Sequence, residues 1–172
     1  MKQAGTSGND TLRIGWREWV GLPDLGVDAV KAKIDTGART SALHAWNIEP
    51  FRRAGELWLR FELHPIQRSE AMKVKCEARA VDERAVRNSG GGVERRYIIE
   101  TELKLGARSW PIERALTNRD QMGFRMLLGR TALGSRTLIV PGRSFLASPR
   151  SPLKLRRGRR STSALELSKL LP

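Results

Sequence analysis

The Asp-Thr-Gly triplet at Asp35, Thr36 and Gly37 is the part of the chain whose residue types are best suited to catalysis. Because the triplet follows the apolar Ile34, the Asp35 carboxylate is expected on a tight turn at the end of a buried strand. Glycine lets the backbone approach closely, and the threonine hydroxyl can hydrogen-bond within the turn and hold the carboxyl plane still. The same three residue types also form ordinary turns, so that a plain turn is the alternative interpretation.

A second motif supports the catalytic interpretation. It runs from Met126 to Arg130 (MLLGR), and its Gly129 lies 92 residues after Gly37. The first motif resembles the catalytic signature of aspartic peptidases. In retropepsin-like folds, a strand that ends in two apolar residues and a glycine passes beside the catalytic loop, and a short helix follows it. The order and the separation of the two motifs suit such a domain, although a plain core strand would read the same way.

Two longer stretches carry a resemblance to a bacterial family. Residues 31–45 (KAKIDTGARTSALHA) and 15–23 (GWREWVGLP), together with the second motif, are similar to the retropepsin-like family often filed as ATP-dependent zinc proteases. The resemblance covers roughly residues 12–147. It implies an aspartic-type endopeptidase on an all-β fold, a small closed barrel with one short helix after the second motif. The family usually reads Val-Asp-Pro after that motif, whereas Val140 is followed directly by Pro141 here.

The family label mentions ATP and zinc, but the sequence lacks the usual motif for binding either of them. ATP binding by a P-loop needs a Gly-Lys-Ser/Thr cradle, and no Gly-Lys pair occurs in the sequence. A zincin needs two histidines one helical turn apart, whereas His44, His64 and Cys76 are widely spaced. We therefore expect no metal and no other cofactor. His64 is expected in a loop, and His44 can contact substrate or fill a structural role.

The number of carboxylates in suitable surroundings predicts the assembly. Aspartic peptidases use two carboxylates that share a proton around one water molecule. The chain has one Asp-Thr-Gly triplet, and Asp24, Asp28, Asp82 and Asp120 lack its apolar strand and glycine. The chain is also too short for two such lobes. We therefore expect a C2 homodimer in which each protomer contributes one Asp35.

Basic residues near the triplet predict an acidic substrate. Arg39 stands two residues after the motif glycine, where retroviral relatives have an acid that lines the cleft. With Lys33 and Arg130 it could make the cleft cationic, and arginine binds carboxylates in bidentate geometry. We assign Arg39, Thr40, His44 and Arg130 to the substrate-binding set. The alternative for Arg39 is an ion pair that braces its own loop.

The resemblance adds an expectation about the identity of the substrate. Members of the family are associated with ATP-grasp ligases that add glutamates to a ribosomal protein. This association implies an acidic peptide or a glutamate-modified protein as substrate, with oligoglutamate and a ribosomal protein among the candidates.

The glycine-rich segment at residues 88–92 (NSGGG) is the candidate cover of the cleft. Retropepsins close their cleft with a hairpin flap whose tip is rich in glycine, and this segment lies between the two motifs, as that order requires. Glycine permits opening and a close approach to a bound peptide, and we assign Gly91 to the substrate-binding set. A plain surface loop is equally compatible.

Regular short strands separated by turns predict a closed β barrel rather than βαβ units. The expected strands cover residues 12–22, 29–34, 41–51, 57–63, 72–81, 97–105 and 110–116, with turns at 23–26 and 106–109. We expect three parts: a disordered N-terminus (residues 1–10), a peptidase domain (11–147) and a flexible basic tail (148–172).

Charge and composition indicate which partners and which cellular compartment suit the protein. The net charge is +14, half of it in the residues after 142. Such a basic arm suits contacts with nucleic acid, the ribosome or an acidic protein, and the runner-up function is a non-catalytic barrel module that binds these partners. A single cysteine fits a reducing compartment, and no apolar run is long enough to span a membrane. We therefore expect a cytoplasmic protein with no membrane contact.

Overall fold

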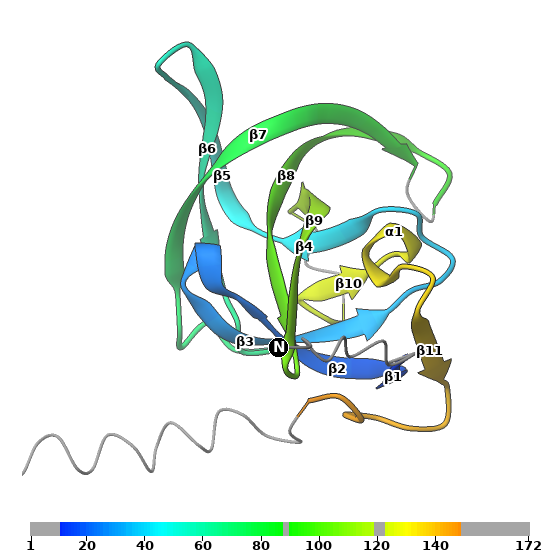
Figure 1. Ribbon diagram of the computed structural model, residues 1–172. Coiled ribbons are helices and arrows are strands. Elements are labelled where there is room, and N and C mark those ends of the chain that lie inside the picture. The colour runs from blue at the N-terminus through cyan, green and yellow to red at the C-terminus, as the bar shows by residue number, and fades with distance from the viewer. Residues whose placement is uncertain (1–10, 88–89, 119–122, 149–172) are drawn as a thin grey trace, which may run out of the picture.

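The computed structural model describes residues 11–87, 90–118 and 123–148 (Figure 1). The described part contains one short α-helix, and the rest of its regular structure is β apart from a 3₁₀ turn at Pro23–Leu25. The strands are β1 (Leu12–Gly15), β2 (Arg17–Leu22), β3 (Val27–Ile34), β4 (Ser41–His44), β5 (Trp46–Arg53), β6 (Glu56–Leu63), β7 (Val74–Arg87), β8 (Val93–Leu105), β9 (Arg108–Thr117), β10 (Met126–Leu128) and β11 (Thr137–Val140), and the helix is α1 (Arg130–Leu133). The tails expected at 1–10 and 148–172 lie outside the described residues, except for Ser148.

Six strands close into a barrel in the order β2-β3-β10-β4-β9-β8, and Gly21 of β2 pairs with Lys104 of β8 to complete the ring. A Cβ atom on Gly21 would lie 3.1 Å from the carbonyl oxygen of Asp28 and 3.4 Å from Cβ of Lys104, so that glycine eases this closure. Strands β7, β6 and β5 continue the sheet beyond the barrel. The all-β closed barrel and the short helix after the second motif, which the sequence predicted, are confirmed.

The strand that leads to the Asp-Thr-Gly triplet has one buried face and one outer face. Val30, Ala32 and Ile34 of β3 are buried in the core, and the alternate residues Lys31 and Lys33 face outward. β10 lies parallel to β3 and antiparallel to β4. The two sequence motifs are therefore neighbours in the sheet.

Strands β7 and β8 are longer than the sequence predicted. Their pairing runs from Ala80 opposite Ile99 to Arg87 opposite Val93, with a register shift between Ala80 and Asp82. In the view of Figure 1, this hairpin arches over the barrel, and its far end reaches the side on which α1 lies. The extension escapes a search for buried alternation because none of its described residues is buried.

The expected single strand over residues 12–22 is wrong, because two strands that belong to different sheets occupy this range. β1 pairs with β11 in a separate parallel sheet, and β2 joins the barrel. Between them, the Trp16 N–H donates to the carbonyl of Arg143 at 2.8 Å. A Cβ on Gly15 would lie only 2.4 Å from the same carbonyl oxygen, so that glycine makes room for the crossing segment.

A buried carboxylate fastens the two ends of the described chain together. Glu18 accepts hydrogen bonds from the N–H groups of Gly15 (2.7 Å), Leu146 (2.8 Å), Ala147 (3.2 Å) and Ser148 (3.1 Å), and from the Ser148 hydroxyl (2.5 Å). We call this arrangement the Glu18 clasp. It compensates the burial of the carboxylate with a full set of donors.

Candidate active site

The Asp35 carboxylate is held by the backbone of its own turn. The Asp35 N–H donates to the carbonyl of Leu128 in β10 at 2.9 Å, which fixes where the turn begins. Asp35 Oδ1 accepts hydrogen bonds from the N–H groups of Gly37 (3.1 Å) and Ala38 (3.3 Å). The side chain of Thr36 is exposed. Among the described residues, the hydrogen bonds that orient the carboxyl group therefore come from backbone N–H groups, whereas the sequence pointed to the threonine hydroxyl.

Arg130, the first residue of α1, braces this turn from the second motif. Its Nη1 donates to the carbonyl oxygens of Thr36 (2.8 Å) and Gly37 (3.1 Å), and its backbone N–H donates to that of Ala38 (2.9 Å). The guanidinium thus lies against the turn that carries Asp35. The sequence assigned Arg130 to substrate binding, and the spacing of the motifs gave no sign of this positioning contact.

The rest of the loop rests on the residues around Gly129. A Cβ there would lie 2.7 Å from the carbonyl oxygen of Arg39 and 2.7 Å from the carbonyl carbon of Thr40, both backbone atoms. The N–H and the hydroxyl of Thr131 both donate to the Arg39 carbonyl, at 3.1 and 2.8 Å. The buried Ser41 hydroxyl accepts from the Gly129 N–H at 3.1 Å, a contact that the sequence did not predict.

The residues assigned to substrate binding lie in different surroundings. Arg39 is exposed, and no described residue forms a hydrogen bond or ion pair with its guanidinium. Thr40 is half-buried beside Gly129. Gly91 is exposed at the end of the β7–β8 hairpin, with φ of 83°, a conformation that suits glycine.

Both histidines are buried and stack against one tryptophan. The ring centroids of His44 and Trp46 are 3.8 Å apart at an interplanar angle of 8°, and those of Trp46 and His64 are 3.8 Å apart at 14°. His64 lies in a loop, as expected, but its side chain is buried, and this stack explains the burial. His44 is only 1% exposed, a placement that matches the structural role left open by the sequence.

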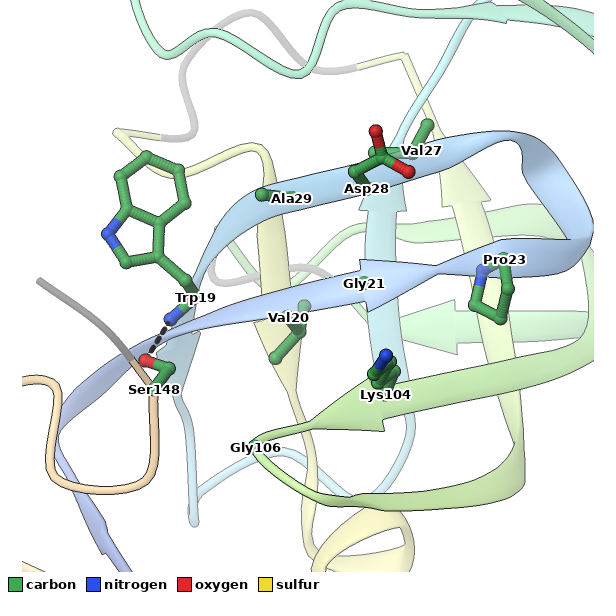
Figure 2. A pocket seen from close by; sticks show the side chains of 10 residues that line it. All are labelled: Trp19, Val20, Gly21, Pro23, Val27, Asp28, Ala29, Lys104, Gly106 and Ser148. Atoms are coloured by element: carbon green, nitrogen blue, oxygen red, sulfur yellow. Dashed lines mark hydrogen bonds between the residues drawn. The ribbon is translucent and has the colours of Figure 1, made fainter. Parts of the chain in front are cut away.

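A pocket of about 300 Å³ lies on the outside of β2 and β3, where Trp19, Asp28 and Lys104 are among its lining residues. Figure 2 shows the Ser148 hydroxyl bonded to the backbone N–H of Trp19 at one end of this pocket. None of residues 35–41 lines it. Within the described residues, we find no cluster of three or more His, Cys, Asp or Glu side chains placed to hold a metal ion, and no helix long and apolar enough to cross a membrane.

The family model described as "RimB-like: Retropepsin-like aspartic endopeptidase RimB" matches residues 13–150. The chain belongs to this RimB-like family. A solved structure of a protein of unknown function from Legionella pneumophila subsp. pneumophila str. Philadelphia 1 has the same fold, with a TM-score of 0.68 and 26% identity. The match covers 81% of this chain and 100% of that one.

Curated relatives carry a different kind of name. A probable alpha-L-glutamate ligase of Shewanella halifaxensis is 52% identical over 132 residues, which are 77% of this chain and 29% of that protein. A protein of the same name from Parasynechococcus marenigrum is 50% identical over 128 residues, 74% of this chain and 28% of its own length. The chain thus spans less than a third of the length of these relatives.

Proposed function

We propose that the protein is an aspartic endopeptidase, active as a homodimer in which two copies of Asp35 form the catalytic pair. The observation that carries the proposal is the Asp35 carboxylate, which the Gly37 and Ala38 N–H groups orient on a turn that the Arg130 guanidinium braces through the Thr36 carbonyl. Membership of the RimB-like family supports this reaction class. One such carboxylate per chain makes a C2 dimer the simplest complete site.

The proposed reaction needs the two carboxylates in different protonation states. The ionised Asp35 takes a proton from the water molecule between them, and the resulting hydroxide attacks the peptide carbonyl. The protonated Asp35 of the other protomer stabilises the developing oxyanion and then supplies a proton to the leaving amine. The C–N bond breaks and one water molecule is consumed.

We propose that the substrate is an acidic peptide, with oligoglutamate and glutamate-modified ribosomal protein as the leading candidates. The exposed Arg39 and Lys33 put positive charge on the loop and on the strand that carries Asp35. The relatives named as glutamate ligases support a link with glutamate chemistry. A reducing cytoplasmic setting suits a chain with a single cysteine, which is buried.

Asp35→Asn tests the catalytic part of the proposal. The variant keeps the side-chain shape and an oxygen for the Gly37 N–H, so that its fold and sedimentation should match those of the unmodified protein while hydrolysis of a glutamate-rich peptide is lost. Treatment with EDTA should leave the rate unchanged. Loss of activity in EDTA that zinc restores would refute the aspartic mechanism.

Dilution tests the shared site. If each protomer supplies half of the catalytic pair, specific activity falls as the concentration passes below the dimer dissociation constant. A protomer that sediments as a monomer and keeps full specific activity would require a second carboxylate from the same chain. A stable dimer without any hydrolytic activity would instead favour the runner-up, a binding module for ribosome, RNA or an acidic protein.

A further inference from the structure

A second pocket, of about 450 Å³, is lined by residues of β2 and β3 and of the segments that carry Gln67 and Phe124. Its charged lining consists of Arg17, Lys31 and Arg68, and none of its lining residues is acidic. Trp16 and Phe124 supply an aromatic wall, with ring centroids 5.9 Å apart in an edge-to-face arrangement. We call this site the cationic pocket. Its polar and apolar parts together suit an anionic group on a short carbon chain.

The three cations face one another without a counter-ion among the described residues. Burial, followed by the charges of Arg17 and Arg68, lowers the pKa of Lys31. The Lys31 ammonium also lies 5.1 Å from the centre of the Trp19 ring. No described carboxylate makes a salt bridge to any of the three cations. Their mutual repulsion raises the free energy of the empty pocket, and a bound carboxylate would relieve it.

The outer face of β3 leads from the cationic pocket to the catalytic carboxylate. Lys31 and Lys33 lie two positions apart in β3, the spacing that keeps side chains on one face, and Asp35 follows two positions later, one residue beyond the end of the strand. Arg17 lies opposite Lys33 in the β2–β3 pairing. A strand advances about 3.3 Å per residue, so that the pocket lies roughly 13 Å from Asp35 along the strand. An extended peptide covers this distance in about four residues.

We propose that the cationic pocket is a specificity subsite that binds a carboxylate side chain of the substrate about four residues from the bond that is cleaved. Arginine and lysine supply charge-assisted hydrogen bonds to the carboxylate, and the aromatic wall packs against its methylene groups. The cleavage distance rests on the proposed peptidase function. The binding of carboxylates in the cationic pocket is independent of that function.

Binding to the full chain carrying Asp35→Asn tests the pocket without catalysis. The probes are octaglutamate, octaglutamine and inorganic phosphate, measured by isothermal titration calorimetry. The pocket variant is Lys31→Gln with Arg68→Gln, and the matched control is Lys75→Gln with Arg13→Gln, which removes the same charges at exposed sites. Arg17 stays in place because its Nε also donates to the Ser144 hydroxyl.

We expect octaglutamate to bind at least tenfold more weakly to the pocket variant and less than twofold more weakly to the control, with no binding of octaglutamine. Equal losses in the two variants would overturn the proposal, because they would indicate general attraction by net charge. Phosphate that binds as tightly as octaglutamate and is lost in the same variant would also overturn it, in favour of a phosphate site.

A position scan then separates the subsite from the proposed function. In peptides with a single glutamate, the pocket variant should lose roughly tenfold in kcat/KM only where the glutamate lies about four residues from the cleaved bond. A uniform loss at every position would refute the assigned distance. Pocket-dependent binding of octaglutamate without any cleavage would leave the pocket intact and refute the peptidase instead.

Discussion

Arg130 donates a 2.8 Å hydrogen bond from its guanidinium to the backbone carbonyl of Thr36, the central residue of the Asp-Thr-Gly triplet. A side chain that sequence reasoning assigns to substrate thus supports the loop that carries Asp35. This relationship leads to a prediction about turnover.

Arg130→Met should lower kcat about tenfold while KM changes little, because the loop loses its brace and the Asp35 carboxylate becomes less well positioned. Hydrogen bonds from charged groups contribute about 1.5–3 kcal/mol, and solvent exposure puts this pair at the lower end of that range. Arg136→Met removes the same charge from an exposed site nearby and serves as control. A loss confined to KM would return Arg130 to the substrate-binding set.

Arg39→Ala should act on KM and on the choice of substrate. Its carbonyl anchors the loop through Thr131, but its side chain has no partner among the described residues, so that truncation leaves the loop in place. We expect kcat/KM for glutamate-rich peptides to fall roughly tenfold to a hundredfold, as for the loss of one charge-assisted bond. Neutral peptides should be unaffected, and equal losses for both peptide classes would contradict the role in specificity.

Gly129→Ala should destabilise the protein by about 3 kcal/mol, the upper end of the usual cost of overpacking, because the new methyl group meets three backbone atoms of Arg39 and Thr40. Urea denaturation followed by circular dichroism measures the change. Gly142→Ala is the control, since a Cβ there has no atom within 4 Å and its φ is not positive. Similar effects for the two substitutions would mean that the contact at Gly129 relaxes without cost.

Much of the site could be predicted from the sequence because its two motifs are local. The strand before Asp35 and the strand before Gly129 each carry their own hydrophobic pattern. The glycine at position 129 indicates that another part of the backbone passes close to it. Arg130 and Ser41 act through backbone atoms about 90 residues away, so that no local pattern encodes them. The same reason explains why the split of residues 12–22 into β1 and β2 was missed, since the parallel partner of β1 is β11.

Glu18→Gln should cost about 3 kcal/mol of unfolding free energy. The carboxylate accepts on both oxygens, whereas glutamine offers one acceptor and would turn an amide N–H₂ toward donor groups. Glu100→Gln, at an exposed position of β8, is the matched control and should change the free energy by less than about 0.5 kcal/mol. A denaturation midpoint for Glu18→Gln equal to that of the control would mean that the Glu18 clasp adds little.

The Cys76 thiol should be inert at neutral pH and should make stability fall in alkali. Burial raises its pKa from the ordinary value of 9.0 to about 11. Above pH 9 the unfolded chain loses this proton while the folded chain keeps it, so that unfolding free energy declines between about pH 9 and 11. Denaturation at pH 8 and at pH 10.5, with Cys76→Ala as control, measures the decline. The prediction fails if the decline is as steep in the alanine variant, or if iodoacetamide labels the native thiol rapidly at pH 7.5.

The Glu18 clasp cannot form until the ribosome has synthesised nearly the whole described chain. Glu18 is separated from its donors Leu146, Ala147 and Ser148 by 128 to 130 residues. At about 5–20 residues per second, translation takes roughly 6–26 s to supply them. For most of that interval β1 also lacks its partner β11, so that the nascent chain exposes an unpaired strand edge to chaperones until β11 has been made.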